Sequence, residues 1–212
     1  MARRLPVYIL IDTSGSMRGE PIESVKVGLS DMVASLRIDP YALETVCISI
    51  ITYDSDVKQV LPLTALENLQ LPEIECPESG PTHTGAALNM LCDCYDKEVN
   101  MGNREQKGDW MPLLFILTDG NPSDLMVYEQ AILNVKKHLF TSIVACAAGP
   151  KAKTEPLKKL TDNVFTLDTM DSNTFKKFFQ WVTINVQQGG KTMGVADNGV
   201  ELPPPPSEIN LI

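Results

Sequence analysis

The sequence predicts an α/β fold, doubly wound around a mainly parallel six-stranded sheet with one antiparallel edge strand. Apolar, strand-like segments alternate along the chain with segments of helical periodicity, which is typical of βαβ units and a parallel sheet. Two strand-like segments are joined only by Asp54-Ser55-Asp56, a connection of hairpin length, so one edge strand runs antiparallel. The 212 residues, 43% of them apolar, suffice for one domain with its own core.

The predicted strands are short apolar runs bounded by polar or turn-forming residues. The first and the fourth run each lead directly into an aspartate, Asp12 and Asp119. The predicted strands cover residues 5–11, 44–53, 57–62, 112–118, 141–148 and 163–167.

The first predicted helix begins at Pro21, a favoured first helical position, and ends at Asp39-Pro40. The last predicted helix carries an apolar stripe of phenylalanine and valine at the spacing expected of a helix packed on a sheet. Trp181 lies off that stripe, so we expect it to be partly exposed. The helices after the first are predicted at residues 85–101, 124–138, 154–160 and 172–187.

The composition changes after Gln188, which predicts a domain over residues 1–188 and a Gly/Pro-rich C-terminal tail over 189–212. Gly189-Gly190, Asp197-Asn198-Gly199 and the four prolines from Pro203 are not expected to continue a helix or a central strand. The proline run favours polyproline II, which serves either as a stiff spacer, the interpretation we prefer, or as a docking segment.

Charge and composition exclude several functions. The 18 basic and 27 acidic residues give a net charge of −9, which disfavours nucleic acid as a partner, because binding to phosphates depends on Lys and Arg. No apolar run approaches the roughly 18 residues that span a bilayer, and the run after Arg3-Arg4 is too short for a signal peptide. The five cysteines form no regular framework and are interpreted as reduced thiols. We therefore expect a cytoplasmic protein without a membrane partner.

The turn from Asp12 to Ser16 is the strongest functional signal, because it places a carboxylate and two serine hydroxyls at the end of a strand. Asp119 ends a second apolar strand, and the loop Thr82-His83-Thr84 precedes a predicted helix. In an open parallel sheet, ligands bind outside the carboxyl ends of the strands, so these loops are expected to meet. Oxygen ligands with one or two carboxylates suit Mg²⁺, whereas His83 is expected at the rim.

This combination resembles the metal-ion-dependent adhesion site (MIDAS) of von Willebrand factor A (VWA) domains, which have a Rossmann-like fold. The resemblance implies Asp12, Ser14, Ser16, Thr82 and Asp119 as metal ligands, with Thr84 as the alternative to Thr82. Gly80-Pro81 stands where a Gly-Gly pair is expected. The resemblance also implies Mg²⁺ as the cation, with Mn²⁺ or Ca²⁺ as alternatives. The bound ion then captures an Asp or Glu of a partner protein, above a rim that includes Pro122, Ser123 and Asp124.

Further segments are similar to bacterial TerY-type proteins of the tellurium-resistance group. That resemblance covers nearly the whole chain and implies a cytoplasmic stress-response role. It also implies a protein kinase and a protein phosphatase of the same gene cluster as partners. The segments that carry it are residues 4–8, 19–22, 117–124 and 178–182.

Two other interpretations of the turn compete with protein binding. A magnesium-dependent phosphoesterase would use Asp12 as a nucleophile, but Ser14 stands where its second acidic residue is expected, and no catalytic triad, Cys-His pair or P-loop is present. Alternatively, the loops hydrogen-bond one another without an ion, although two clustered carboxylates then become harder to ionise. The sequence therefore favours a binding protein over an enzyme.

Overall fold

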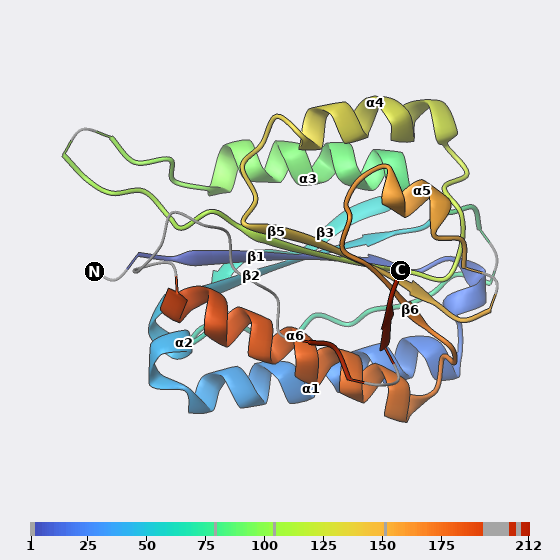
Figure 1. Cartoon of the computed structure of the whole chain (residues 1–212), viewed down its shortest axis with the longest axis horizontal. Coiled ribbons are helices and arrows are strands. Elements are labelled where there is room, and N and C mark those ends of the chain that lie inside the picture. The colour runs from blue at the N-terminus through green and yellow to red at the C-terminus, as the bar shows by residue number, and fades with distance from the viewer. Residues whose placement is uncertain (1–2, 79, 104, 151, 193–203, 207–208) are drawn as a thin grey trace.

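The computed structural model describes residues 3–78, 80–103, 105–150, 152–192, 204–206 and 209–212. In these residues, helices cover both faces of one sheet, giving three layers (Figure 1). A short 3₁₀ turn, η1 (Gly15–Met17), follows the first strand. The strands are β1 (Leu5–Asp12), β2 (Val46–Tyr53), β3 (Val57–Ala65), β4 (Leu113–Thr118), β5 (Ser142–Ala148), β6 (Val164–Leu167) and β7 (Ile209–Leu211). The helices are α1 (Glu20–Ile38), α2 (Pro40–Thr45), α3 (Thr84–Glu98), α4 (Leu125–Val135), α5 (Glu155–Lys158) and α6 (Ser172–Thr192).

The strand order in the sheet is β3-β2-β1-β4-β5-β6-β7. Five neighbouring strands of this order pair in parallel, namely β2, β1, β4, β5 and β6. Strand β3 pairs antiparallel with β2. These pairings confirm the predicted fold class and the antiparallel hairpin edge. Because parallel strands point the same way, the carboxyl ends of β1, β2 and β4 lie at one end of the sheet. That end is on the right in Figure 1.

The sheet has seven strands, so the prediction of six was wrong. The additional strand, β7, pairs antiparallel with β6 and forms a second antiparallel edge. Three residues are too few to show a strand periodicity, and only pairing with β6, together with burial of Ile209, makes them a strand. Part of the predicted tail therefore belongs to the sheet. Asp197-Asn198-Gly199 and Pro203 lie outside the described residues, and residues 204–206 have no regular secondary structure.

The predicted end of the last helix was also wrong, and one helix was missed. Helix α6 continues through Gly189-Gly190 to Thr192, because extending an existing helix through a glycine costs only about 1 kcal/mol per residue. Asp39-Pro40 ends α1 but also begins α2, which the sequence analysis missed. The Asp39 carboxylate accepts hydrogen bonds from the backbone N–H groups of Tyr41 and Ala42, so it caps α2, and β2 starts only at Val46.

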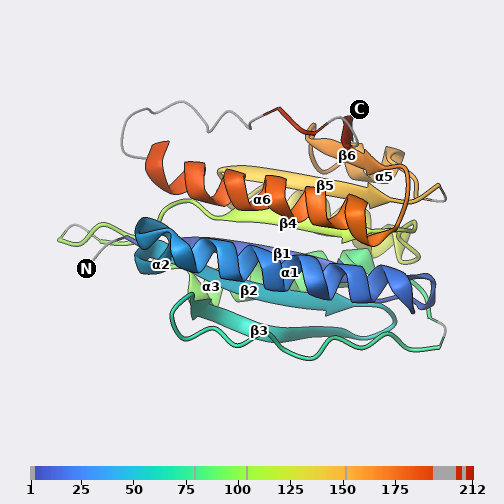
Figure 2. The same cartoon turned by 90° about the horizontal axis from the view of Figure 1, so that it is seen from below.

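Helices α1 and α6 lie side by side across one face of the sheet (Figure 2), together with α2. Gly28 permits this contact, because a Cβ at that position would overlap the ring of Phe179. Trp181 is only 2% exposed and lies 4.7 Å from Phe165, measured between ring centroids. Its predicted partial exposure was wrong, because α6 packs over β6 as well as over the central strands.

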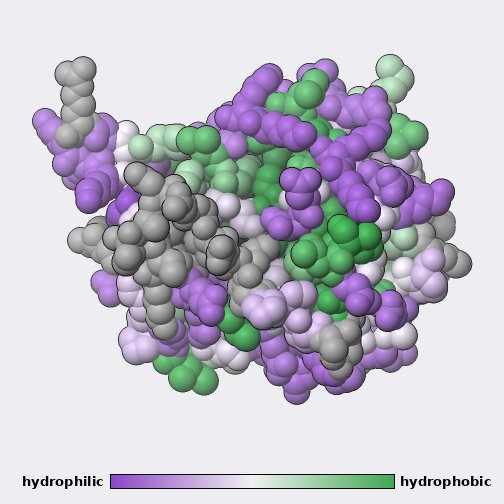
Figure 3. Space-filling model, viewed as in Figure 1, coloured by the Kyte–Doolittle hydropathy of each residue, from purple (hydrophilic) through white to green (hydrophobic). Residues whose placement is uncertain are grey.

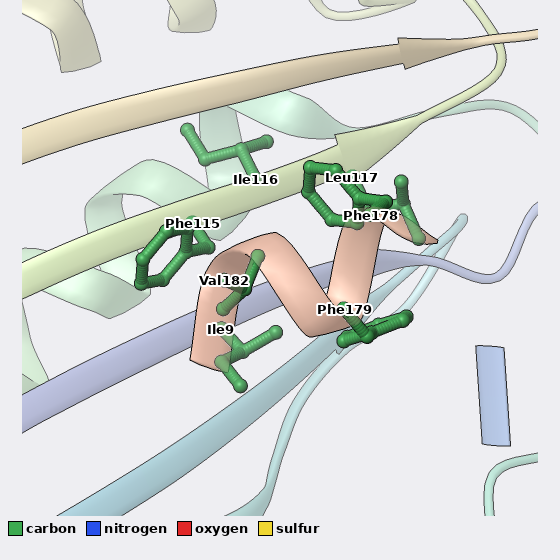
Figure 4. Close-up of a pocket in the computed structure, with 7 residues that line it drawn as sticks. All are labelled: Ile9, Phe115, Ile116, Leu117, Phe178, Phe179 and Val182. Carbon is green, nitrogen blue, oxygen red and sulfur yellow. The ribbon is translucent and has the colours of Figure 1, made fainter. Parts of the chain in front are cut away.

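The face of α6 toward the sheet leaves a cavity of only about 10 Å³, space for one water at most. Figure 4 shows Phe178, Phe179 and Val182 of α6 around this cavity, opposite side chains of β1 and β4. The other face of the sheet is covered by α3, α4 and α5, which pack on a second apolar core. Both faces of the central strands are therefore buried, and the loops at the strand ends remain available for binding.

Most of the surface seen in Figure 3 is hydrophilic, with apolar residues gathered beside the C-terminal strand. Leu211 and Ile212 are 57% and 48% exposed there. Among the described helices, none combines the length and the apolar character needed to cross a membrane.

Candidate metal centre

Asp12 is the last residue of β1, and its side chain is held in place by the turn that follows β1 and by the end of β4. It is fully buried. Its Oδ1 accepts a hydrogen bond from the Ser14 backbone N–H at 2.8 Å, and its Oδ2 accepts one from the Thr118 hydroxyl at 2.7 Å. Because Thr118 ends β4, the neighbour of β1 in the sheet, the orientation of this carboxylate is set by the central strands themselves.

The two serines of the turn present their hydroxyls together. Ser14 is buried and Ser16 is exposed, and their Oγ atoms are 3.3 Å apart. Thr13, between Asp12 and Ser14, turns instead toward β2 and donates its hydroxyl to the Asp54 carboxylate at 2.9 Å. The turn therefore gives a carboxylate and two neighbouring hydroxyls, the arrangement that the sequence analysis predicted.

The Thr82 loop is hydrogen-bonded to the loop that contains Asp119. The Thr82 N–H donates to Ser123 Oγ at 3.0 Å, and the Ser123 N–H donates to the Thr82 carbonyl at 2.8 Å. The Thr82 hydroxyl lies 3.3 Å from the position that a Cβ on Gly120 would occupy, directly beside buried Asp119. The absence of a side chain at Gly120 thus lets the threonine hydroxyl approach the carboxylate loop.

Thr84 and His83 take different positions from Thr82. Thr84 begins α3, is 1% exposed, and its hydroxyl has no hydrogen-bond partner among the residues that the structure describes. His83 is half-buried, and its backbone N–H donates to the Asp54 carbonyl at 3.0 Å. Its ring Nδ1 lies 3.2 Å from the Ser55 carbonyl on the β2–β3 turn. The contact with Gly120 therefore distinguishes Thr82 from Thr84.

Asp124 has a role that the sequence analysis did not find. Its carboxylate accepts hydrogen bonds from the backbone N–H groups of Gly85 at 3.1 Å and Ala86 at 2.9 Å, so it caps the N-terminus of α3. Gly85 also packs against α4 so closely that a Cβ would overlap the Tyr128 backbone. Asp124 therefore joins the Thr82 loop to the Asp119 loop. The sequence analysis placed Asp124 at the rim and at the start of a helix. An aspartate at a helix start is typical of a cap for that helix, and no local signal indicates that it caps a different one.

The electrostatics of the site favour a cation. Burial raises the pKa of Asp12 to about 6, and the nearby Asp119 carboxylate adds to this rise, while the hydrogen bonds from Thr118 and Ser14 oppose it. No basic side chain among the described residues forms an ion pair with Asp12. Two carboxylates and neutral hydroxyls form a hard oxygen donor set, which fits Mg²⁺ better than a thiol- or imidazole-seeking metal.

No group of three or more His, Cys, Asp or Glu residues suited to a metal occurs in the part of the chain that the structure describes. All five cysteines are free thiols.

A family model of the von Willebrand factor type A domain matches residues 7–181. The chain belongs to this family. VWA domains typically bind a divalent metal at the MIDAS and mediate protein–protein interactions, and the match spans every candidate ligand of this chain.

Curated relatives of this VWA domain include bovine matrilin-1 and chicken matrilin-3, each 32% identical over 126 residues. These alignments cover 58% of this chain but only 22% of matrilin-1 and 27% of matrilin-3. The relatives are thus much longer than the region they share with this chain.

Solved structures with the same fold include proximal thread matrix protein 1 of the mussel byssus and a mutant of the PilB minor pilin of Streptococcus sanguinis. The mussel protein, in a structure with a zinc-occupied MIDAS motif, gives a TM-score of 0.59 at 18% identity, over 86% of this chain and 46% of that one. The pilin gives a TM-score of 0.61 at 11% identity, over 93% and 64%. At these identities the comparisons establish the fold alone.

Proposed function

We propose that this VWA domain captures a carboxylate of a partner protein through a divalent cation. We assign the metal ligands as Asp12, Ser14, Ser16, Thr82 and Asp119, and the ion as Mg²⁺, with Mn²⁺ or Ca²⁺ as alternatives. The observation that carries the proposal is the buried Asp12 carboxylate, which lies beside Asp119 and forms no ion pair among the described residues. A bound cation supplies the missing positive charge.

The charge balance explains why the cation would bind an external carboxylate. Asp12 and Asp119 contribute two negative charges at most, and the serine and threonine ligands contribute none. Mg²⁺ usually keeps several waters when only one or two carboxylates bind it, and such a water is replaceable by an acidic side chain. When bound, the cation supplies an electrophilic centre. The five assigned ligand residues direct their oxygen atoms toward the cation and position the cation at the end of the sheet.

The geometry argues against Asp12 as the nucleophile of a phosphoesterase. Its side chain is fully buried, and both carboxylate oxygens already accept hydrogen bonds. The Ser14 hydroxyl lies 3.3 Å from Ser16 Oγ, and among the described residues neither serine hydroxyl is hydrogen-bonded to a histidine that could act as its base. We therefore propose a binding function and no enzymatic one.

The setting of this function rests on the resemblance to TerY-type proteins. We propose a cytoplasmic role in a bacterial stress or tellurium-resistance system, with a protein kinase and a protein phosphatase of the same gene cluster as partners. The acidic net charge of −9 supports protein rather than nucleic acid as the ligand.

Affinity capture from a lysate of the source organism tests the proposal. Immobilised wild-type protein in Mg²⁺, the same protein in chelator, and Asp12→Asn in Mg²⁺ are compared by mass spectrometry. Asp162→Asn provides the matched control, because Asp162 is an exposed carboxylate just before β6, at the opposite end of the sheet from the candidate site. We expect a set of proteins that wild type and Asp162→Asn retain in Mg²⁺ and that chelator and Asp12→Asn both release.

Partners retained under all four conditions would contradict metal-bridged capture. Isothermal titration with Mg²⁺ separates the two parts of the proposal, because the ion binds to wild type but not to Asp12→Asn if the ligand assignment is correct. Recovery of a kinase or phosphatase in the Mg²⁺-dependent set would support the stress-response setting.

A further inference from the structure

An apolar step borders the candidate metal site on one side. It consists of three consecutive residues at the start of α4, Leu125, Met126 and Val127, which are 57%, 88% and 43% exposed. Isolated apolar residues are common on protein surfaces, but three in succession beside a candidate binding site indicate a contact surface. Asp124, the residue immediately before them, is hydrogen-bonded to the first turn of α3, so the step is fixed relative to Thr82.

An acidic groove borders the site on the other side. It has a volume of about 290 Å³ and is lined by Thr13, Thr52, Asp54, Asp56, Lys58, Val60, Glu73, Ile74 and Glu75. Thr13 lies between the candidate ligands Asp12 and Ser14, and its hydroxyl is bonded to Asp54, so the groove is continuous with the metal turn. Its volume is at the lower limit of small-molecule pockets, which suits a single long side chain better than a metabolite.

The charge of the groove selects a cationic occupant. Its lining holds four carboxylates and one ammonium group, that of Lys58, which is already paired with Asp56 at 2.9 Å. Glu73 approaches only Lys26, at 3.9 Å, and Glu75 takes part in none of the ion pairs among the described residues. A lysine or arginine side chain would lay its aliphatic part against Val60 and Ile74 and its charge against the carboxylates.

The sheet order places these two surfaces on opposite sides of the metal. Asp12 ends β1, the groove lies beyond it at β2 and β3, and the apolar step follows β4 on the other side. The carboxyl ends of β1, β2 and β4 and the beginning of the antiparallel β3 lie at the same end of the sheet (Figure 1). A bound segment that crosses this end would contact the groove, the cation and the step in succession.

We propose that the partner presents its metal-binding Asp or Glu between a Lys or Arg, which enters the acidic groove, and an apolar residue, which packs on Leu125 and Met126. The inference rests on the proposed function, because the acidic residue of the partner is held by the cation. It adds the residues that determine specificity and the chemical class of the recognised segment. A partner that is acidic throughout would be repelled by the groove, and one that is polar throughout would leave the step exposed to water.

Selection from a phage-displayed library of random linear peptides tests the inference without knowledge of the natural partner. Wild-type protein is panned in Mg²⁺, and peptides that are released by chelator are sequenced. We expect an acidic residue with a basic residue on one side and an apolar residue on the other. A representative peptide is then synthesised, and its affinity is measured by fluorescence anisotropy.

Two variants with matched controls assign each preference to its surface. Glu73→Gln/Glu75→Gln is expected to weaken binding about fivefold, mainly for peptides that keep the basic residue, and Glu44→Gln at the opposite end of β2 is its control. Met126→Ser is expected to weaken binding about tenfold for peptides that keep the apolar residue, and Leu133→Ser near the other end of α4 is its control. All of these side chains are exposed, so folding is preserved.

The outcomes separate the inference from the function on which it rests. Mg²⁺-dependent peptides that share only an acidic residue, or that bind both variants as tightly as wild type, would overturn the inference and leave metal-bridged capture intact. The complete absence of Mg²⁺-dependent peptides, together with the absence of Mg²⁺ binding in titration, would overturn both.

Discussion

Replacement of Asp12 by asparagine tests the electrostatic argument for the cation directly, in protein kept free of metal by a chelator. Burial raises the pKa of Asp12 from 3.8 to about 6, so the folded protein binds this proton more tightly than the unfolded chain does. The stabilisation by the proton is therefore complete below pH 3.8 and is lost as the pH rises through about 6. Asparagine does not titrate, so Asp12→Asn removes this dependence.

The magnitude follows from the size of the shift. A rise of about two pKa units corresponds to about 3 kcal/mol in the free energy of unfolding, at 1.36 kcal/mol per unit. Asparagine keeps an acceptor for the Ser14 N–H and offers a donor to the Thr118 hydroxyl, so the changed hydrogen bonds contribute a constant offset. Relative to wild type, the variant should therefore gain about 3 kcal/mol of stability between acidic and neutral pH.

Urea unfolding in chelator, repeated from about pH 4 to about pH 7.5, measures this difference. Asp56→Asn is the control, because a hydrogen bond to Lys58 lowers the pKa of Asp56, so any pH dependence that it removes has the opposite sign. A stability difference between wild type and Asp12→Asn that stays constant across this range would refute the reasoning. The buried charge of Asp12 would then carry no energetic cost for a cation to relieve.

Three further predictions concern the ligands and their support. Thr82→Val should lower Mg²⁺ affinity at least about tenfold, and Thr84→Val should leave it nearly unchanged, because, of these two hydroxyls, it is that of Thr82 that approaches Gly120. Isothermal titration of both variants measures the two affinities. The reverse ranking would identify Thr84 as the ligand. Asp124→Ala should also weaken Mg²⁺ binding about tenfold. Asp124→Asn should recover part of the affinity, because the asparagine oxygen still accepts one of the two hydrogen bonds from the first turn of α3. Equal Mg²⁺ affinity in wild type and both variants would contradict the link between the loops. Gly28→Ala should lower the free energy of unfolding, measured by urea denaturation, by about 2 kcal/mol without changing Mg²⁺ affinity, because the added Cβ overlaps the Phe179 ring in the contact between α1 and α6. An unchanged stability would show that α6 can shift to accommodate the methyl group.

Much of the fold was predictable from the sequence because its main signals are local. The apolar runs of the central strands are buried on both faces in a parallel sheet, so they stand out as continuous stretches, and the prediction of β1 and β4 differs from the structure by one residue. The antiparallel edge was predictable for a similar reason, since three residues between β2 and β3 leave no room for a crossover.

The sequence predictions were wrong where contacts between residues that are distant in the sequence determine the local structure. Trp181 lies off the helical stripe of α6 and is buried only because β6 lies beneath it. The three residues of β7 form a strand only through pairing with β6. Helix α6 passes through Gly189-Gly190, where local propensity predicted an end.

By itself, the sequence determined the class of the fold and the chemistry of the candidate site. Asp12, Ser14 and Ser16 are joined by contacts across two residues, and such contacts are encoded in a short turn. Only the tertiary structure decided that Asp124 caps α3, across 38 residues, and that an acidic groove and an apolar step border the site on opposite sides. The physical reason is that strand order and helix packing arise from burial of apolar surface over the whole chain, which no local pattern specifies.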